Sequence, residues 1–285
     1  MKYFFTFLLL STILIAQNKN SVTFNDTLFI KHSDKIPVVD GIPNDEIWET
    51  INWEPIDQVW MTYGENIDKS DFNGFYKICW NEETNLLYFL VKTHDDYFVD
   101  GYKYSQNPAE GKNYPDFDIL EIFIDEDLSG GLHVFNSKEE INLWGSNSVN
   151  AFTHHMVINK PDEGQTVTLY VDCDIEGISW EDYFIIDYKN HFNNYKVKRT
   201  GDEYCWEFSM GVYSDKYKHD KPEDSRVKLY NNKSMGLSLA YCDNDGVDES
   251  PKTRDNFFGS VYVEPDAYND HWKDANGYRK VVLVK

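Results

Sequence analysis

The stretch DFDILEIFIDEDLSGG (116–131) decides the fold class of this chain. Its apolar residues alternate with a period of two, as in a β-strand, so Leu120, Ile122 and Ile124 share one face. Glu121 lies on the opposite face between two apolar neighbours, which is a costly position for a charge without a partner. We therefore predict a strand with one core-facing side and one side on which Glu121 meets a ligand or a partner. The alternative is a half-exposed strand whose glutamate is simply solvated.

Four other segments show the same alternation. FNGFYKICW (72–80) and LLYFLVKTHDD (86–96) are joined by a polar turn and predict a β-hairpin. YCWEFSM (204–210) and MGLSLAYC (235–242) each place their large apolar side chains on one face. These faces are expected to share a core with the strand in 116–131.

Helix is expected at one place only. In PNDEIWETINW (43–53), Asn44 can cap a short helix, and Trp48 would seat it on the sheet. Elsewhere, short strands alternate with turn residues, and no repeat or linker divides the chain. These features predict an all-β fold, a single antiparallel β-sandwich that is jelly-roll-like, with a short N-terminal helix and long loops. Residues 17–285 are expected to form one domain.

The N-terminal segment MKYFFTFLLLSTILIA (1–16) has the pattern of a secretory signal peptide. A lysine precedes an apolar run that ends in a small residue, Ala16. The run is too short to span a bilayer, and no later stretch is apolar enough to do so. We therefore expect an exported protein, periplasmic or extracellular, without a transmembrane segment.

Composition narrows the class of partner. The 285 residues include 49 acidic and 27 basic ones, for a net charge of −22, together with 20 Tyr, 18 Phe and 8 Trp. So negative a surface repels nucleic acid and anionic membranes, and it suits neutral partners or cations. Surplus Tyr and Trp indicate a binding surface, because they combine wide apolar faces with a polar group.

Several acidic clusters are candidate cation sites. DNDGVDE (243–249) groups carboxylates around a glycine turn, and Ca²⁺ prefers such oxygen ligands. We expect a structural calcium ion; the alternative is that these acids are only solvated. The candidate ligands are Asp95, Asp125, Asp127, Asp243 and Asp245.

The four cysteines, Cys79, Cys173, Cys205 and Cys242, are widely spaced and include no C-x-x-C pair. A zinc site is therefore not expected. Export permits disulfides, and buried free thiols are the alternative.

Two further kinds of site are conceivable. Glu121 and Glu207 both lie mid-strand, and a glycoside hydrolase acting on O-glycosyl bonds needs two carboxylates that flank the scissile bond. His154 and Met156 share a face of the strand NAFTHHMVI (150–158), and they are candidates for binding a haem. Two neighbours on one face, however, cannot reach both sides of a haem. Because His155 points the opposite way, it cannot share a metal with His154.

Taken together, four segments resemble the family 9 carbohydrate-binding modules, which are sugar-binding β-sandwich domains of exported bacterial polysaccharide-degrading systems. The segments are VVDGIPNDEIW (38–48), WNEETNLLYFLVKTHD (80–95), DILEIFIDED (118–127) and the C-terminal run 235–285. They occur in the family's order over nearly the whole mature chain, with extra length between about 133 and 200.

The resemblance implies a carbohydrate site. A C-terminal tryptophan that stacks on sugar in the family matches Trp272, and the family's asparagine and strand glutamate match Asn269 and Glu121. A second stacking tryptophan is replaced by Pro115, and Tyr114 is the nearest aromatic substitute. An indole face suits the C–H surface of a pyranose, while a carboxylate and an amide suit its hydroxyls.

From the residues and the resemblance we expect an exported, non-catalytic module that binds an oligo- or polysaccharide. It would take part in polysaccharide catabolism beside separate glycoside hydrolases. No catalytic residue is assigned.

Overall fold

The structure is a computed structural model in which five longer segments and four short strands are described. The longer segments are 26–100, 117–133, 151–158, 189–246 and 254–285, and the strands are 166–167, 170–171, 173–176 and 184–187.

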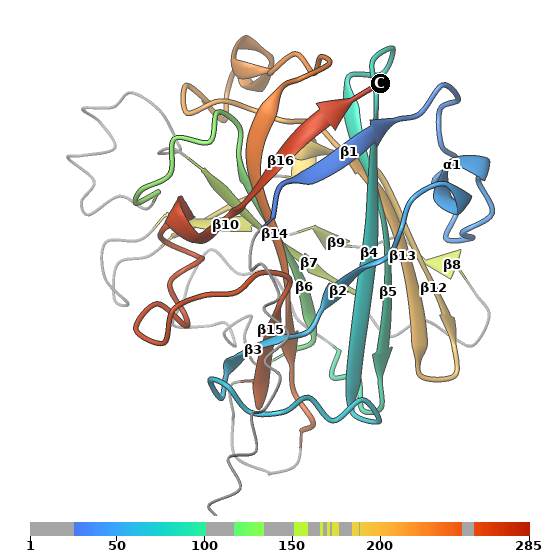
Figure 1. The fold of residues 1–285 in the computed structure, drawn as a ribbon, viewed down its shortest axis with the longest axis vertical. Helices are drawn as coiled ribbons and strands as arrows, with labels where there is room; N and C mark the ends of the chain where they lie inside the picture. The colour runs from blue at the N-terminus through green and yellow to red at the C-terminus, as the bar shows by residue number, and fades with distance from the viewer. Residues whose placement is uncertain are drawn as a thin grey trace, which may run out of the picture.

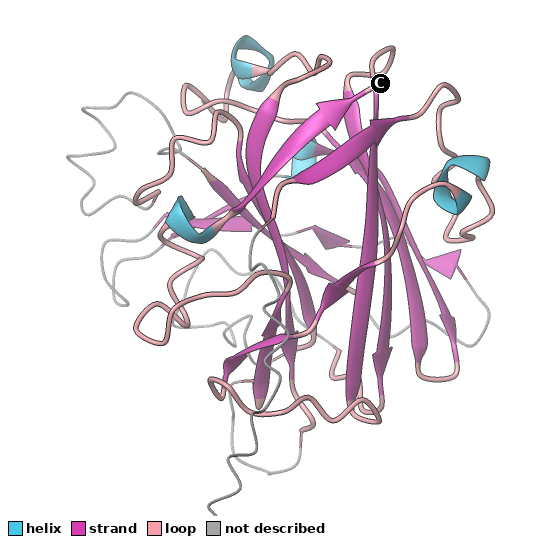
Figure 2. Ribbon diagram, in the orientation of Figure 1, coloured by secondary structure: helices cyan, strands magenta, loops and turns pink. Residues whose placement is uncertain are grey.

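Strands dominate the structure, and fourteen of them form one large sheet (Figures 1 and 2). Along its main path, hydrogen-bonded neighbours follow one another as β8 (Thr166–Val167), β12 (Phe192–Thr200), β13 (Glu203–Met210), β5 (Leu86–Asp95), β4 (Phe72–Asn81), β1 (Leu28–His32), β16 (Arg279–Val284), β14 (Ser234–Asp243), β6 (Ile119–Asp125), β7 (Phe152–Val157) and β9 (Tyr170–Val171). Three strands lie off this path: β2 (Glu54–Ile56), which pairs with β4, and β3 (Gln58–Met61) and β15 (Asn256–Gly259), which extend from β14. A separate pair consists of β10 (Cys173–Glu176) and β11 (Phe184–Asp187).

The sheet is mixed, which corrects the prediction of a purely antiparallel, jelly-roll-like sandwich. The N-terminal strand β1 runs parallel to both of its neighbours, β16 and β4 (Figure 1). The other strand pairs in the described part of the chain are antiparallel. Strands β1 and β16 join the β4–β5 hairpin to β14. The half that contains β8, β12, β13, β5 and β4 and the half that contains β14, β6, β7 and β9 therefore belong to one continuous sheet.

The main core lies between the two halves of this folded-over sheet. The ring of Phe72 on β4 stacks on Tyr241 of β14 at 4.7 Å and on Phe258 of β15 at 4.4 Å. The predicted inward faces are confirmed, because the alternate apolar residues of β6, β13 and β14 join this core. They include Leu120, Ile122, Ile124, Trp206, Phe208, Leu237 and Leu239. The predicted hairpin is also confirmed as β4 and β5.

Helix α1 (Glu46–Glu49) is shorter than the predicted segment, and Asp45 rather than Asn44 is its N-cap. Trp48 is buried against Cys79, Tyr88 and Leu90 on the outer face of β4 and β5, so its predicted role of seating the helix is confirmed. None of the helices in the described residues is long and apolar enough to cross a membrane. The predicted signal peptide lies outside the described residues.

The three cysteines whose side chains are described are free thiols: Cys79, Cys205 and Cys242. Cys79 and Cys242 are buried, and Cys205 is partly exposed. The side chain of Cys173 lies outside the described part of the structure.

Candidate functional site

Glu121 lies on the outer face of β6 and is 1% exposed, so the alternative of a solvated glutamate is wrong. Its Oε1 accepts a hydrogen bond of 3.1 Å from the thiol of Cys242 on the neighbouring strand β14. Nε2 of His155 lies 3.8 Å from the same oxygen, and Nη1 of Arg254 lies 3.9 Å from it. The carboxylate thus lies near a guanidinium, a thiol and an imidazole, and burial lowers the pKa of that imidazole.

Arg254 joins this buried carboxylate to the loop before β16. Its Nη2 donates a 2.7 Å hydrogen bond to Oδ1 of Asn269, and its guanidinium lies over the ring of Phe257 at 3.9 Å. With Nη1 near Glu121, the arginine spans the two predicted polar residues of the site. Sequence reasoning missed Arg254. The sequence did offer one indication: the chain has only four arginines, and Arg254 stands in an acidic segment, where a basic residue is unusual.

Trp272 follows Asn269 in the same loop and is partly buried. It packs against a hydrophobic cluster that includes Trp60, Phe257 and Cys242. Since Cys242 contacts Glu121 and Phe257 contacts Arg254, this cluster connects the indole to the polar residues. The structure therefore assembles Trp272, Asn269 and Glu121 around one cluster. The fourth predicted residue, Tyr114, lies outside the described residues.

A cavity of about 300 Å³ adjoins the loop that carries Asn269 and Trp272. Its polar lining includes Tyr262, Glu264, Asp270, His271 and Asp274. Burial lowers the pKa of His271 to about 3, so this imidazole is neutral. The lining offers carboxylates, a phenol and a neutral imidazole, all of which can hydrogen-bond to hydroxyl groups.

Three aspartates form a buried cluster between β5, β6 and β14. One carboxylate oxygen each from Asp95, Asp118 and Asp243 lies within 4.8 Å of the others. Asp95 and Asp243 were predicted as calcium ligands. Asp118 was not, although it stands in the stretch that decides the fold.

The residues of this cluster fit a cation. Asp95 accepts a 2.6 Å hydrogen bond from the hydroxyl of Tyr241, and Asp118 accepts from the backbone N–H groups of Val99 and Asn244. Oδ2 of Asp243 is buried and meets no hydrogen-bond donor in the described part of the chain. Burial, followed by the charge of Asp95, raises the pKa of Asp243 to about 9. Three buried carboxylates this close need either protons or a cation to balance them.

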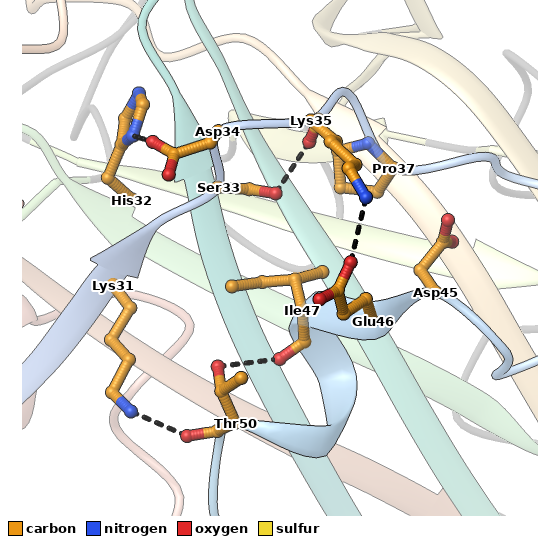
Figure 3. A pocket seen from close by; sticks show the side chains of 10 residues that line it. All are labelled: Lys31, His32, Ser33, Asp34, Lys35, Pro37, Asp45, Glu46, Ile47 and Thr50. Atoms are coloured by element: carbon orange, nitrogen blue, oxygen red, sulfur yellow. Dashed lines mark hydrogen bonds and ion pairs between the residues drawn. The ribbon is translucent and has the colours of Figure 1, made fainter.

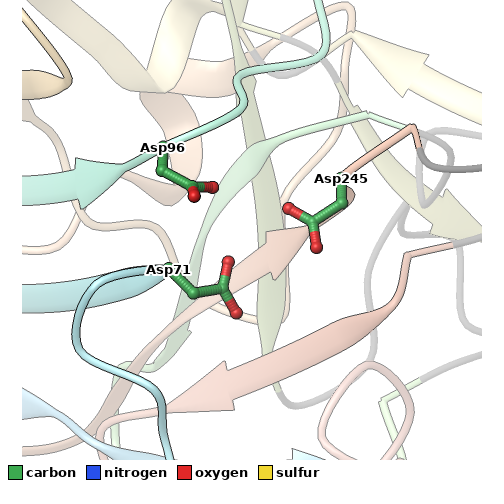
Figure 4. Close-up of side chains that lie close together, drawn as sticks. All are labelled: Asp71, Asp96 and Asp245. Atoms are coloured by element: carbon green, nitrogen blue, oxygen red, sulfur yellow. The ribbon is translucent and has the colours of Figure 1, made fainter.

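A second group of aspartates contains two partly buried residues, Asp71 and Asp245, and one exposed residue, Asp96. Asp71, Asp96 and Asp245 turn their carboxylates toward one another from three separate segments (Figure 4). Burial raises the pKa of Asp71 to about 6, with Asp245 and Asp96 adding to the effect. Asp245, predicted as a ligand together with Asp243, thus belongs to the outer group of carboxylates.

Asp125 and Asp127, also predicted as calcium ligands, do not join either of these groups. They lie at the opposite end of β6 from Asp118 and organise the loop that follows. Oδ2 of Asp125 accepts a 2.8 Å hydrogen bond from the Gly130 N–H, and Oδ1 of Asp127 accepts one of 3.1 Å from the Ser129 N–H. Both carboxylates therefore stabilise the turn that follows β6.

A cavity of about 390 Å³ between β1 and α1 is less suited to a ligand (Figure 3). Its charged groups are already paired with each other or with the backbone. Lys35 binds Glu46 at 2.8 Å, His32 lies 3.1 Å from Asp34, and Lys31 donates to a backbone carbonyl. A ligand would have to displace these contacts.

Comparison with known proteins identifies the family. Residues 39–285 match the model of the carbohydrate family 9 binding domain-like proteins. The chain belongs to this family. Two solved structures, both of a family 9 carbohydrate-binding module from Caldicellulosiruptor kristjanssonii, are similar to it. The complex with cellotriose has a TM-score of 0.55 at 16% identity and covers 91% of this chain and 94% of that one. The complex with glucose has a TM-score of 0.54 at 16% identity, with coverages of 90% and 95%. Comparison with curated proteins gives no match.

The family consists of non-catalytic binding modules, in agreement with the prediction of a binding protein. The positions of the acids also argue against a hydrolase built on Glu121 and Glu207. Glu121 is on the outer face of β6, and Glu207 is on the outer face of β13, where Trp48 donates to it. The main core separates the two, so they cannot flank one glycosidic bond.

A haem site on His154 and Met156 is not supported either. The two nitrogens of His154 lie 3.2 Å from the carbonyl of Ile122 and 2.9 Å from Nδ1 of His191, all of them buried. As predicted, His155 is on the opposite face of β7, beside Glu121.

Proposed function

We propose that this protein is an exported, non-catalytic module that holds a neutral oligo- or polysaccharide against Trp272. The observation that carries this proposal is the link from Arg254 to Asn269, three residues before the indole. Family membership supports carbohydrate as the class of ligand. The related module binds cellotriose and glucose, so β-linked glucose chains are the first ligands to test.

Each side chain has a distinct part in this proposal. The exposed part of Trp272 would stack on the C–H face of a pyranose. Because Oδ1 of Asn269 is held by Arg254, the Nδ2 group is left to donate to a sugar hydroxyl. Glu121 is too deeply buried to reach solvent, so we assign it the role of positioning Arg254. The adjoining cavity of about 300 Å³ would receive a second sugar unit. Tyr114 stays a predicted second wall.

A glycan array on the mature protein tests the proposal. We expect retention of β-glucan oligosaccharides by the wild type and loss of retention by Trp272→Ala, with Tyr230→Ala as a control for removing a different exposed aromatic ring. If the Trp272→Ala variant still retained these oligosaccharides, the binding site would lie elsewhere.

We further propose that Asp95, Asp118 and Asp243 hold a structural cation, with calcium as the first candidate. Carboxylate oxygens are the ligands that Ca²⁺ prefers, and the unpartnered oxygen of Asp243 supports the assignment. Asp71, Asp96 and Asp245 would form an outer position for a second ion. Thermal unfolding with and without EDTA tests this, and an unchanged melting temperature would contradict it.

The wider setting is also part of the proposal. The pattern of residues 1–16 supports export, periplasmic or extracellular, and the folded-over sheet would act as a single β-sandwich module. We propose that it supplies polysaccharide to separate glycoside hydrolases of the same degradation system. Cell fractionation and co-purification with such enzymes would test this setting.

A further inference from the structure

The outer face of the β12–β13–β5–β4 half carries lysines that the proposed sugar site does not use. The strand register places Phe75, Lys92, Cys205 and Lys198 in one row across the four strands. Lys77 lies two residues beyond Phe75 on β4, on the same face. We call this surface the lysine face, and it consists of Trp53, Phe75, Lys77, Lys92, Cys205 and Lys198.

Trp53 provides an aromatic platform on this face. Its side chain is among the exposed large hydrophobic ones, at 36%. Nζ of Lys77 lies 4.6 Å from the ring centroid, and Nζ of Lys92 lies 5.3 Å from it. Lys92 is exposed and Lys77 is buried, so the ammonium group of Lys92 is the one that a ligand on this face can reach. Cation–π attraction holds the three side chains together.

The positive charges of this face are poorly compensated. Among the described residues, no carboxylate lies at ion-pair distance from Lys92 or Lys198, although acids greatly outnumber bases in the chain. Lys77 donates to the backbone carbonyl of Trp48 rather than to an acid. The lysines that do form ion pairs lie elsewhere: Lys35, Lys233, Lys273 and Lys285.

Three carboxylates border the lysine face: Glu203 and Glu207, which lie one row away on either side of Cys205 on β13, and Glu49, whose charge acts on Lys77. Glu207, in the next row of β13, is buried and accepts hydrogen bonds from the backbone of Asp40 and Gly41 and from Trp48. Burial raises its pKa to about 7, so it is only partly ionised near neutral pH. Burial and the neighbouring charge of Lys92 lower the pKa of Lys77, and the charge of Glu49 only partly opposes this effect. An external anion would relieve this repulsion.

We propose that the lysine face is a second carbohydrate surface, which binds a polysaccharide of uronic acid units. A pyranose that stacks on the exposed part of Trp53 and extends toward β5 would bring its ring carboxylate to the ammonium group of Lys92, which is exposed. An extended chain that crosses the strands would meet Lys92 and then Lys198, two strands or roughly 10 Å away. This surface is independent of the neutral-sugar site around Trp272.

Polygalacturonate is the probe that tests the proposal, with its fully methyl-esterified form as the uncharged control. We expect the wild type to bind the charged polymer at low salt, more weakly as salt rises, and not to bind the ester. The double variant Lys92→Glu/Lys198→Glu should bind about tenfold more weakly. Lys92→Gln/Lys198→Gln should weaken binding less, and it serves as a second variant if charge reversal affects folding.

Matched controls separate this surface from a general charge effect and from the first site. Lys280→Glu reverses one charge at an exposed position on β16, half the charge change of the double variant, and should leave polygalacturonate binding unchanged. Trp272→Ala should also leave it unchanged, while the Lys92/Lys198 variants should keep neutral β-glucan binding. The proposal is overturned by equal binding of the ester, by equal weakening in Lys280→Glu, or by preferential binding of sulfated polymer. It is also overturned if the lysine variants convert a wild-type dimer into a monomer.

Discussion

Nη2 of Arg254 and Oδ1 of Asn269 lie 2.7 Å apart, so the orientation of the asparagine amide is fixed by an arginine from another loop. This contact leaves the Nδ2 hydrogens of Asn269 as donors, three residues before Trp272 in the same loop. The site therefore depends on a buried charge that does not itself face solvent.

Replacing Arg254 should affect both stability and binding. Arg254→Met leaves the buried carboxylate of Glu121 without its cation, and we expect a loss of roughly 3 kcal/mol in the free energy of unfolding. Glu121→Gln combined with Arg254→Met should cost less than the sum of the single changes, measured by urea unfolding.

The matched control for this double-mutant cycle of Arg254 and Glu121 is the more exposed pair of Arg279 and Glu54, whose charged atoms lie 2.6 Å apart. Arg279→Met should cost only about 1 kcal/mol, because solvent screens this pair better. Equal costs for the two arginines, or strict additivity of the Arg254 and Glu121 changes, would contradict the assignment of Glu121 as the residue that positions Arg254.

Trp272→Ala should abolish binding of β-glucan oligosaccharides while leaving a folded protein. The indole is partly buried against the cluster around Phe257, so we expect a stability loss of at most about 2 kcal/mol. Isothermal calorimetry gives the affinity, and thermal unfolding gives the stability. A collapse of the melting temperature would instead identify Trp272 as a core residue.

The inner faces of the sheet could be predicted from the sequence because strand geometry imposes a period of two. Leu120, Ile122 and Ile124 follow that period and enter the core as expected. The direction of β1 could not be predicted this way. Periodicity indicates which face of a strand is buried, but not whether its neighbours run parallel to it, and β1 pairs with strands from both ends of the chain.

The candidate site was predictable only in part, for a similar reason. Glu121 and Asn269 were assigned from matched segments, but their connection through Arg254 depends on how a loop folds back over β6. The same packing buries Glu121, which alternation alone leaves half-exposed. Asp118 joins Asp95 and Asp243 because β5, β6 and β14 bring their ends together. The spacing of these acids along the sequence does not indicate how close they lie in the folded protein.

Removing the charge of Asp243 should have opposite effects with and without calcium. In EDTA, Asp243→Asn should raise the melting temperature, because burial and then the charge of Asp95 raise the folded pKa of Asp243 to about 9, so that folding near neutral pH costs the uptake of a proton that asparagine does not need. With calcium, the wild type should gain about 2.7 kcal/mol at a hundredfold excess over Kd, and the variant should gain much less. Asp127→Asn, in the turn after β6, is the control and should keep the calcium response. Full stabilisation of Asp243→Asn by calcium would argue against this cluster as the calcium site.

Glu207 should make the stability of the protein depend on pH in a predictable direction. Burial raises its folded pKa from 4.5 to about 7, so the folded state binds more protons than the unfolded state between these values. Its contribution to the free energy of unfolding is therefore fully present below about pH 4.5 and is lost as the pH rises through 7, by roughly 3 kcal/mol.

The variant Glu207→Gln should remove this pH dependence, although its amide will cost stability at every pH because three donors face the carboxylate of the wild type. The measurement is the difference in unfolding free energy between wild type and variant from pH 4 to 8, with the exposed Glu49→Gln as control. A difference that stays constant over this range would show that Glu207 titrates normally.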